Sequence, residues 1–171
     1  MTDNGIMEKY CCHNEPDSCI KYGGFYHWDE MMQYTTHPGA RGICPTGWHI
    51  PTDEEWKVLE GSVDSQYGIG DQRWDEWGYE RGYDAGTNLK TTYGWYLEGN
   101  GTDLSGFSGL PGGSFSWGSF NGIGTYGMWL SSSEVSEYGM WYRMIKYDSP
   151  GSRRETYTKG NGFSVRCLRD Y

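Results

Sequence analysis

Membrane spans, basic surfaces and a secretion signal are all missing from this sequence. No apolar run among the 171 residues approaches the roughly 20 residues that a membrane-spanning helix needs. The opening MTDNGIMEKY lacks the basic flank and apolar stretch of a signal peptide, so an exported form would have had its signal removed. Lys and Arg number 14 against 23 Asp and Glu, a net charge of −9. Nucleic acids and anionic membranes attract basic surfaces, so neither is an expected partner.

Aliphatic side chains are scarce and aromatic ones are abundant. Hydrophobic residues make up 36% of the chain and aromatic residues 17%, so we expect a core built more from Trp, Tyr and Phe than from aliphatic residues. The 27 glycines follow no Gly-X-Y period, which excludes collagen and predicts tight turns in place of long helices. A chain of this length fits one domain, residues 1–171, that can bury its own core.

The cysteines are odd in number and widely spaced. Two disulfides and one spare thiol would fit an oxidising compartment, so we expect an extracellular or cell-surface location. The alternative is a metal site built from the three N-terminal cysteines and His13. It ranks lower because the paired C-x2-C spacing of zinc sites is absent. The five cysteines are Cys11, Cys12, Cys19, Cys44 and Cys167.

Two segments carry helical signals. In PTDEEWKVLEGSV, Thr52 and Glu55 form a capping box, and the apolar residues that follow recur on one face. This pattern predicts a helix over 53–62. A shorter helix is expected over 27–34, in HWDEMMQY.

The middle of the chain is irregular and the C-terminal part is β-like. Residues 65–86, with frequent glycines and aromatics among charges, indicate an insertion-like surface loop. Three runs rich in Trp, Tyr, Ile and Val follow at 127–134, 139–147 and 162–168, and they predict an antiparallel meander. The segment before the last run, YDSPGSRRETYTK, is expected to be a polar loop.

In the middle run, side chains should alternate between two faces. The odd-numbered Trp141 and Ile145 belong to a core-facing set, and the even-numbered positions from Tyr142 to Asp148 belong to an exposed set. Arg143 has core parity, which it can tolerate only by pairing with a carboxylate or by reaching solvent.

Four blocks resemble the Fibrobacter succinogenes major paralogous domain in order and in spacing. They are GICPTGWHIPTDEEWKVLE (42–60), GTDLSGFSGLPGGSF (101–115), GTYGMWLSSSE (124–134) and 139–170, from GMWYRMIKY to GFSVRCLRD. The stretch CCHNEPDSCIKYGGFYHWDEM is similar to the N-terminal part of the family, where residues 1–24 would form a disulfide-looped portion. The chain departs from the family pattern in the excursion at 67–84 and at Cys12, where relatives usually carry an aromatic residue.

The resemblance implies a fold and a disulfide pattern. The family looks like a branch of the C-type-lectin-like group, which is similar to formylglycine-generating enzymes. It implies an α+β, loop-rich domain of C-type-lectin-like fold, in which two short helices flank a small, twisted antiparallel sheet. It also implies that Cys44 pairs with Cys167 and that Cys11 pairs with Cys19, which leaves Cys12 unpaired.

An enzyme of the formylglycine-generating type is disfavoured. Such enzymes work through a pair of copper-binding cysteines, whereas the C-terminal half of this chain holds only Cys167, which the resemblance assigns to a disulfide. Neither Cys12 with His13 nor Cys44 with His49 has a spacing that favours nucleophile-to-base geometry. The acidic run that opens the predicted helix suits the helix dipole without an acid–base role. We therefore expect no enzyme and no catalytic residue.

No metal or cofactor is expected either. Calcium is the alternative, because Asp103 and Glu134 could supply hard oxygen ligands. The Glu-Pro-Asn and Trp-Asn-Asp signatures of sugar-binding C-type lectins are absent, so calcium-dependent sugar binding is not supported.

The favoured function is a non-enzymatic binding or adhesion module. Amphipathic aromatics, adaptable polar groups and two arginines gather near the C-terminal strands, a composition typical of binding surfaces. A protein is the first expected ligand. Polysaccharide is the alternative, because exposed Trp and Tyr side chains would serve as platforms. The expected contact residues are Tyr138, Tyr142, Met144, Lys146, Asp148, Ser149, Arg153, Arg154 and Tyr157, with Trp74 and Trp77 from the 65–86 loop.

The segment 142–159 also resembles the C-terminal part of the lectin-like variable proteins of diversity-generating retroelements. In those proteins, diversified Tyr, Ser, Asp, Asn, Gly and Arg positions are interleaved with fixed Trp and strand residues. The resemblance implies that the polar and tyrosine positions of this segment are diversified.

Overall fold

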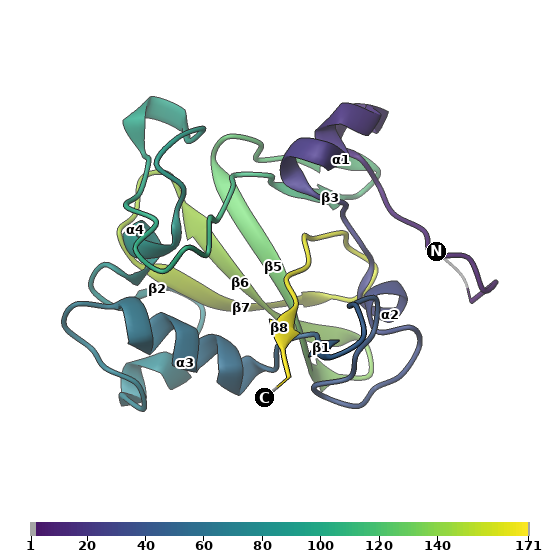
Figure 1. The fold of residues 1–171 in the computed structure, drawn as a ribbon, viewed down its shortest axis with the longest axis horizontal. Helices are drawn as coiled ribbons and strands as arrows, with labels where there is room; N and C mark the ends of the chain where they lie inside the picture. The colour runs from purple at the N-terminus through teal and green to yellow at the C-terminus, as the bar shows by residue number, and fades with distance from the viewer. Residues whose placement is uncertain (1–2, 171) are drawn as a thin grey trace.

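Short helices and strands alternate along residues 3–170, the part of the chain that the computed structural model describes (Figure 1). The α-helices are α1 (Pro16–Tyr22), α2 (Trp28–Met31), α3 (Asp53–Val63) and α4 (Ala85–Leu89). The strands are β1 (Trp48–His49), β2 (Glu80–Arg81), β3 (Ser114–Ser116), β4 (Ser119–Asn121), β5 (Tyr126–Ser136), β6 (Gly139–Lys146), β7 (Ser152–Thr158) and β8 (Leu168–Arg169). Single turns of 3-10 helix cover Cys12–Asn14, Gln72–Asp75 and Tyr96–Glu98. The α+β, loop-rich class is therefore confirmed.

The central sheet has the strand order β2-β7-β6-β5, and each neighbouring pair is antiparallel. Two smaller sheets pair β1 with β8 and β3 with β4. The first two strands of the predicted meander are present as β5 and β6. Its third strand is β7, which lies in the segment expected to be a loop, whereas Phe163 and Ser164 make only isolated bridges to Tyr26 and Trp129. The prediction of a loop was right for 148–151 and wrong for 152–158, and only Leu168 of the strand predicted at 162–168 belongs to a strand, β8.

The helices follow local signals only in part. In α3 the Thr52 hydroxyl accepts from the Glu55 backbone N–H at 3.2 Å, and the Thr52 N–H donates to the Glu55 carboxylate at 2.8 Å, so the predicted capping box is present. The predicted helix at 27–34 is shorter, because α2 ends at Met31. Helices α1 and α4 were not predicted. In α4, Gly86 is required because a Cβ there would lie 1.9 Å from the carbonyl oxygen of Gly151.

Two hydrophobic clusters cover the two faces of the central sheet. One contains Leu130, Tyr142 and Met144 together with side chains of α2, and the other contains Trp129 and Ile145 together with side chains of α3 and α4. Strand β6 is therefore buried on both faces for most of its length. The prediction that its even-numbered side chains form an exposed set was wrong, because alternation separates two faces but does not show which face meets solvent.

A buried cluster of charges joins α3 to the sheet. Asp53 accepts from Arg143 Nη1 at 2.8 Å and from Arg154 Nη2 at 2.7 Å. Glu60 accepts from Arg143 Nε at 3.0 Å and from Arg81 Nη2 at 2.7 Å. The expectation that Arg143 pairs with a carboxylate is confirmed. Burial alone would raise the pKa of Asp53, but the hydrogen bonds and charges of Arg154 and Arg143 outweigh burial and lower it to about 2.

Most residues of the 65–86 segment are exposed, as expected of a surface loop, but some of its side chains reach the core. Trp74 is buried in the cluster on the α3 side, and Arg81 is buried against Glu60. Gly82 has a left-handed backbone (φ 78°) and lies so close to Trp74 that a Cβ would be 2.6 Å from the indole ring. The segment thus supplies β2 to the central sheet and Trp74 and Arg81 to the interior, whereas Trp77, Tyr79 and Tyr83 stay exposed.

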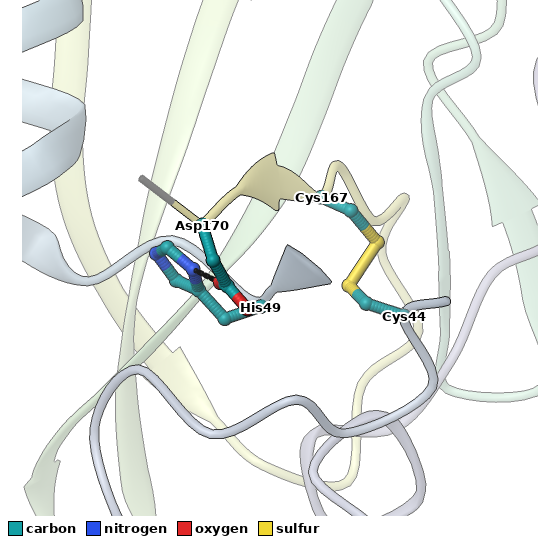
Figure 2. Close-up of a disulfide and its surroundings, with 4 residues drawn as sticks. All are labelled: Cys44, His49, Cys167 and Asp170. Atoms are coloured by element: carbon teal, nitrogen blue, oxygen red, sulfur yellow. Dashed lines mark hydrogen bonds and ion pairs between the residues drawn. A yellow bond between two sulfur atoms is a disulfide. The ribbon is translucent and has the colours of Figure 1, made fainter. Parts of the chain in front are cut away.

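Two disulfides join Cys11 to Cys19 and Cys44 to Cys167, as the resemblance implied. Cys12 is unpaired and buried. The Cys44–Cys167 disulfide links the segment before β1 to the segment before β8, and His49 and Asp170 lie beside it (Figure 2). Two disulfides fit an oxidising, extracellular environment. None of the helices within residues 3–170 combines the length and the apolar character that crossing a membrane requires.

Replacing Glu60 with Gln should lower the free energy of unfolding by about 3–5 kcal/mol, because Arg81 and Arg143 would lose their shared carboxylate in the interior. Urea denaturation measures this change. The matched control is Glu54→Gln on the same helix, where the exposed carboxylate pairs only with Lys57 and the change should stay within about 0.5 kcal/mol. Equal effects of the two substitutions would contradict the assignment of the buried cluster as a structural determinant.

His49 should make the C-terminal end of the fold sensitive to pH. Its Nδ1 lies 2.6 Å from Asp170 and its Nε2 lies 2.9 Å from Glu55. Burial opposes the charge of His49, but hydrogen bonds with these two carboxylates outweigh burial and raise the pKa. A raised folded-state pKa stabilises the fold fully below about 6.5, and this stabilisation is lost as pH rises through the folded-state value.

The melting temperature should therefore fall as the pH rises from about 6 to about 8.5, and His49→Gln should flatten this part of the profile. His37→Gln, at an exposed histidine, is the control and should keep the wild-type slope. Identical slopes for wild type and His49→Gln would refute the assignment.

Candidate functional site

The structure buries five of the eleven predicted contact residues. Trp74, Tyr142, Met144, Ser149 and Arg154 are each exposed by 9% or less, so the expectation that they belong to an open surface was wrong. The physical reason is that β7 is an inner strand of the sheet, and both faces of β6 are covered.

Each buried residue has a structural role. Arg154 donates to Asp53 and lies 3.6 Å from the centre of the Trp141 ring. The Ser149 hydroxyl donates to Glu80 at 2.8 Å. Tyr142 packs against Phe163, and burial, with a smaller contribution from the charge of Glu155, raises the pKa of its hydroxyl.

Three of the predicted residues form part of a surface network of ion pairs. Lys146 lies 3.3 Å from Asp148, and Arg153 lies 2.8 Å from Glu80 and 3.4 Å from Glu155. These charges are half-buried or exposed and largely balance one another. They make the surface at this edge of the sheet polar, and neither positive nor negative charge dominates it.

The exposed aromatic residues among the predicted set lie on different faces. Trp77 is 56% exposed and its ring meets Trp141, which faces α3. Tyr157 is 38% exposed and lies opposite Met140, on the other face of the sheet. The structure therefore does not bring Trp77 and Tyr157 together, although the 65–86 segment reaches β7 through its strand β2.

Trp117, which sequence reasoning missed, is the most exposed large hydrophobic residue among the residues described, at 90%. It lies at the tip of the β3–β4 hairpin, where Trp117 and Gly118 both have left-handed backbone angles, with φ of 53° and 75°. Such two-residue turns favour Asn, Asp or Gly, and a bulky residue there is an outlier. The repeat SFSWGSFN, with a turn glycine between similar runs, is the signal that could have found it.

An open pocket of about 350 Å³ lies beside Trp117. It is lined by Tyr10, His27, Phe115, Trp117, Thr158 and Asn161, among others. Tyr10 and Phe115 stack with their ring centres 4.0 Å apart, and Asn161 donates to the Thr158 hydroxyl at 2.5 Å. Burial lowers the pKa of His27, so its ring favours the neutral form.

The turn after β7 connects this pocket to two predicted tyrosines. Tyr157 precedes Thr158 in β7, and the Lys159 backbone N–H donates to the Tyr138 carbonyl at 3.1 Å. Tyr138 itself is 72% exposed. We call Trp117, Tyr138, Tyr157 and Thr158 the turn surface. It combines three exposed aromatics with an exposed hydroxyl, and Trp117 and Thr158 also line the open pocket.

The carboxylates considered for calcium are held by other groups. Asp103 accepts from the Ser108 backbone N–H at 2.7 Å and from its hydroxyl at 2.6 Å. Glu134 accepts from Lys159 Nζ at 2.5 Å. Within residues 3–170, no group of three or more His, Cys, Asp and Glu side chains is placed to hold a metal ion.

The class that these features define is a small, disulfide-linked α+β domain with an exposed aromatic surface at one end. The sequence model of the Fibrobacter succinogenes major domain matches residues 3–169, and the chain therefore belongs to this family. No curated protein and no solved structure matches the chain. The relation to the C-type-lectin-like group stays a prediction from the sequence.

Replacing Trp117 with Asn should raise the free energy of unfolding by about 1 kcal/mol, because Asn tolerates the left-handed backbone that strains a bulky residue. Urea denaturation measures the change. Tyr93→Asn is the control, because Tyr93 is an exposed aromatic residue outside the set with positive φ, and this substitution should bring no gain. A loss of stability in Trp117→Asn would show that the side chain has a packing role.

Proposed function

We propose that the chain is a non-catalytic binding module, displayed outside the cell or on its surface, that holds a macromolecular ligand on the turn surface. The observation that carries the proposal is Trp117, a 90% exposed indole on a left-handed turn. A left-handed backbone is unfavourable for a bulky residue, and the exposed indole gains little from packing. Residues held in such conformations cluster at ligand-binding sites. The neighbouring Tyr138 and Tyr157 extend the aromatic surface.

A protein is the favoured ligand. Trp and Tyr are the residues that most often dominate protein interfaces, and they offer a large contact area with few side-chain rotations to restrict. The exposed Thr158 adds a hydroxyl group beside the aromatics. The surface is attached to a scaffold held by two disulfides and a buried charge cluster, so it should change little on binding.

The state of the cysteines supports a non-catalytic function. Cys44 and Cys167 are joined to each other, and a thiol in a disulfide is no nucleophile. Cys12 is buried, and burial raises the pKa of its thiol, although a hydrogen bond with Ser18 partly opposes this. Neither Cys12 nor the disulfide offers the reactive thiolate that a formylglycine-generating type of chemistry would need.

Polysaccharide is the second candidate ligand, and the pocket beside Trp117 favours it. A sugar ring can stack on an exposed indole while its hydroxyl groups meet Thr158 and Asn161 at the pocket wall. The protein reading remains first because Tyr138 and Tyr157 lie beyond that pocket and widen the surface.

Diversification by a retroelement would add variation to the same surface. Tyr142, Met144 and Arg154 are core residues, so a varied segment could change freely only at exposed positions such as Tyr157 and Thr158. A genome neighbourhood without a reverse transcriptase and a template repeat would remove this part of the proposal.

The ligand class can be tested with one protein and two arrays. The chain is screened against a glycan array and against a panel of purified surface proteins from neighbouring cells, and a hit counts only if Trp117→Ala, Tyr138→Ala or Tyr157→Ala weakens it. We expect a protein hit that one of these substitutions weakens about 30-fold or more, the loss typical of an interface hot spot.

Tyr93→Ala is the matched control, because Tyr93 is an exposed tyrosine outside the turn surface and its loss should leave affinity within about twofold. A glycan hit with the same pattern would replace the protein by the polysaccharide reading. Silence in both arrays, or hits that Tyr93→Ala weakens as much as the turn-surface variants, would refute the proposal.

A further inference from the structure

A second pocket, of about 290 Å³, opens between α3, the loop 105–107 and the C-terminal segment 166–168. Its apolar walls are Pro51, Trp56, Leu59, Phe107 and Leu168. Trp56 and Phe107 meet edge to face, with ring centres 5.8 Å apart. Flat apolar walls and a volume near the lower end of the usual range indicate space for a small molecule. The pocket shares no residue with the turn surface.

Arg166 lines this pocket and forms no ion pair with another residue of the described range 3–170. Its Nη2 donates to the Ser108 backbone carbonyl at 2.9 Å, and its guanidinium lies 5.0 Å from the centre of the Phe107 ring. Among residues 3–170, no carboxylate oxygen lies within 4.0 Å of it. Burial lowers the pKa of Arg166, and the charge of Asp103 opposes that effect only in part. A half-buried guanidinium in this state favours an incoming carboxylate.

Trp56, which also lines the pocket, has an unpaired donor. Its side chain is 2% exposed, and its indole Nε1 is one of two buried side-chain polar atoms in the described part of the chain that have no hydrogen-bond partner. Buried donors in native proteins are nearly always paired, so this N–H is a local exception. Because Nε1 is enclosed, a molecule in the pocket would meet the Trp56 ring and not its N–H.

Glu55 also lines the pocket, but its negative charge does not determine which ligand charge the pocket attracts. Its carboxylate accepts from the Thr52 backbone N–H and hydroxyl, each at 2.8 Å, and it pairs with His49 at 2.9 Å. Burial by itself would raise the pKa of Glu55, but the bonds with Thr52 and His49 lower it. The Glu55 carboxylate is therefore already paired, and Arg166 remains the charged pocket residue that has no ion-pair partner within residues 3–170.

We propose that this pocket binds a small organic acid, a flat apolar body that carries one carboxylate. The carboxylate lies against Arg166, and the body lies between Trp56, Phe107 and Leu168. The proposal is independent of the function proposed for the turn surface.

Phenylacetate is a suitable probe, because it has a flat ring and one carboxylate on ten non-hydrogen atoms. At about 0.3–0.4 kcal/mol per atom it should bind with a Kd of roughly 1–10 mM. The measurement follows the indole N–H resonances of the chain labelled with ¹⁵N-tryptophan, in which Trp56→Phe assigns the Trp56 signal. We expect a saturable shift of that signal. Phenylacetamide, which has the same shape without the charge, should bind about tenfold more weakly.

The substitution Arg166→Gln keeps a donor for the Ser108 carbonyl and removes the charge. It should weaken phenylacetate about tenfold and leave phenylacetamide nearly unchanged. Arg169→Gln is the matched control, because it makes the same charge change three residues further on, at an exposed position that does not line the pocket. It should leave the affinity for phenylacetate unchanged.

Several results would overturn the proposal. The first is the absence of a saturable shift of the Trp56 signal up to about 50 mM phenylacetate, well above the expected Kd. Equal affinity for phenylacetate and phenylacetamide on the wild-type chain would also do so, and it would not depend on any variant folding. Equal losses in Arg166→Gln and Arg169→Gln would show that net charge, and not Arg166, attracts the acid.

Discussion

The buried charge cluster on α3 is the constraint on which the rest of the fold depends. Asp53 and Glu60 on this helix accept from Arg81, Arg143 and Arg154, which come from β2, β6 and β7. Desolvation offsets much of the attraction within such a cluster, so its net contribution to stability is modest. Its effect is on arrangement, because a strand out of register would leave an arginine unpaired in the interior, which costs several kcal/mol.

This constraint decides which surfaces remain available for a ligand. The inner face of β7 is used by the cluster, since Ser152 donates to Glu60 and Arg154 donates to Asp53. The 148–158 segment, whose composition is typical of a contact surface, therefore lies partly in the interior. What remains for contact lies at the ends of the strands, at the turn after Thr158 and at the β3–β4 tip. Those positions make few core contacts, so they can carry exposed aromatics without disturbing the packing.

Sequence reasoning predicted the elements that depend on nearby residues and missed those that depend on residues far away in the chain. The α3 helix follows from a capping box and an apolar face, and both disulfides follow from the family resemblance. The β7 strand could not be predicted, because SRRETYT is polar and its Arg154 is buried against distant partners such as Asp53, 101 residues earlier. Trp117 was missed for a different reason. Its turn is a local feature, but its exposure depends on whether another segment packs over it.

The places where the structure leaves local rules unsatisfied mark the two candidate binding sites. Trp117 has a strained backbone and an exposed indole, and Trp56 has a buried N–H without an acceptor. The other unpaired buried atom, Arg81 Nε, belongs to a guanidinium whose two terminal nitrogens are bonded to Trp74 and Glu60. The packing around the charge cluster does not explain the strained backbone of Trp117 or the unpaired N–H of Trp56. A broad aromatic surface and a small pocket differ in the size of ligand they fit, so the two sites can serve one module without competing.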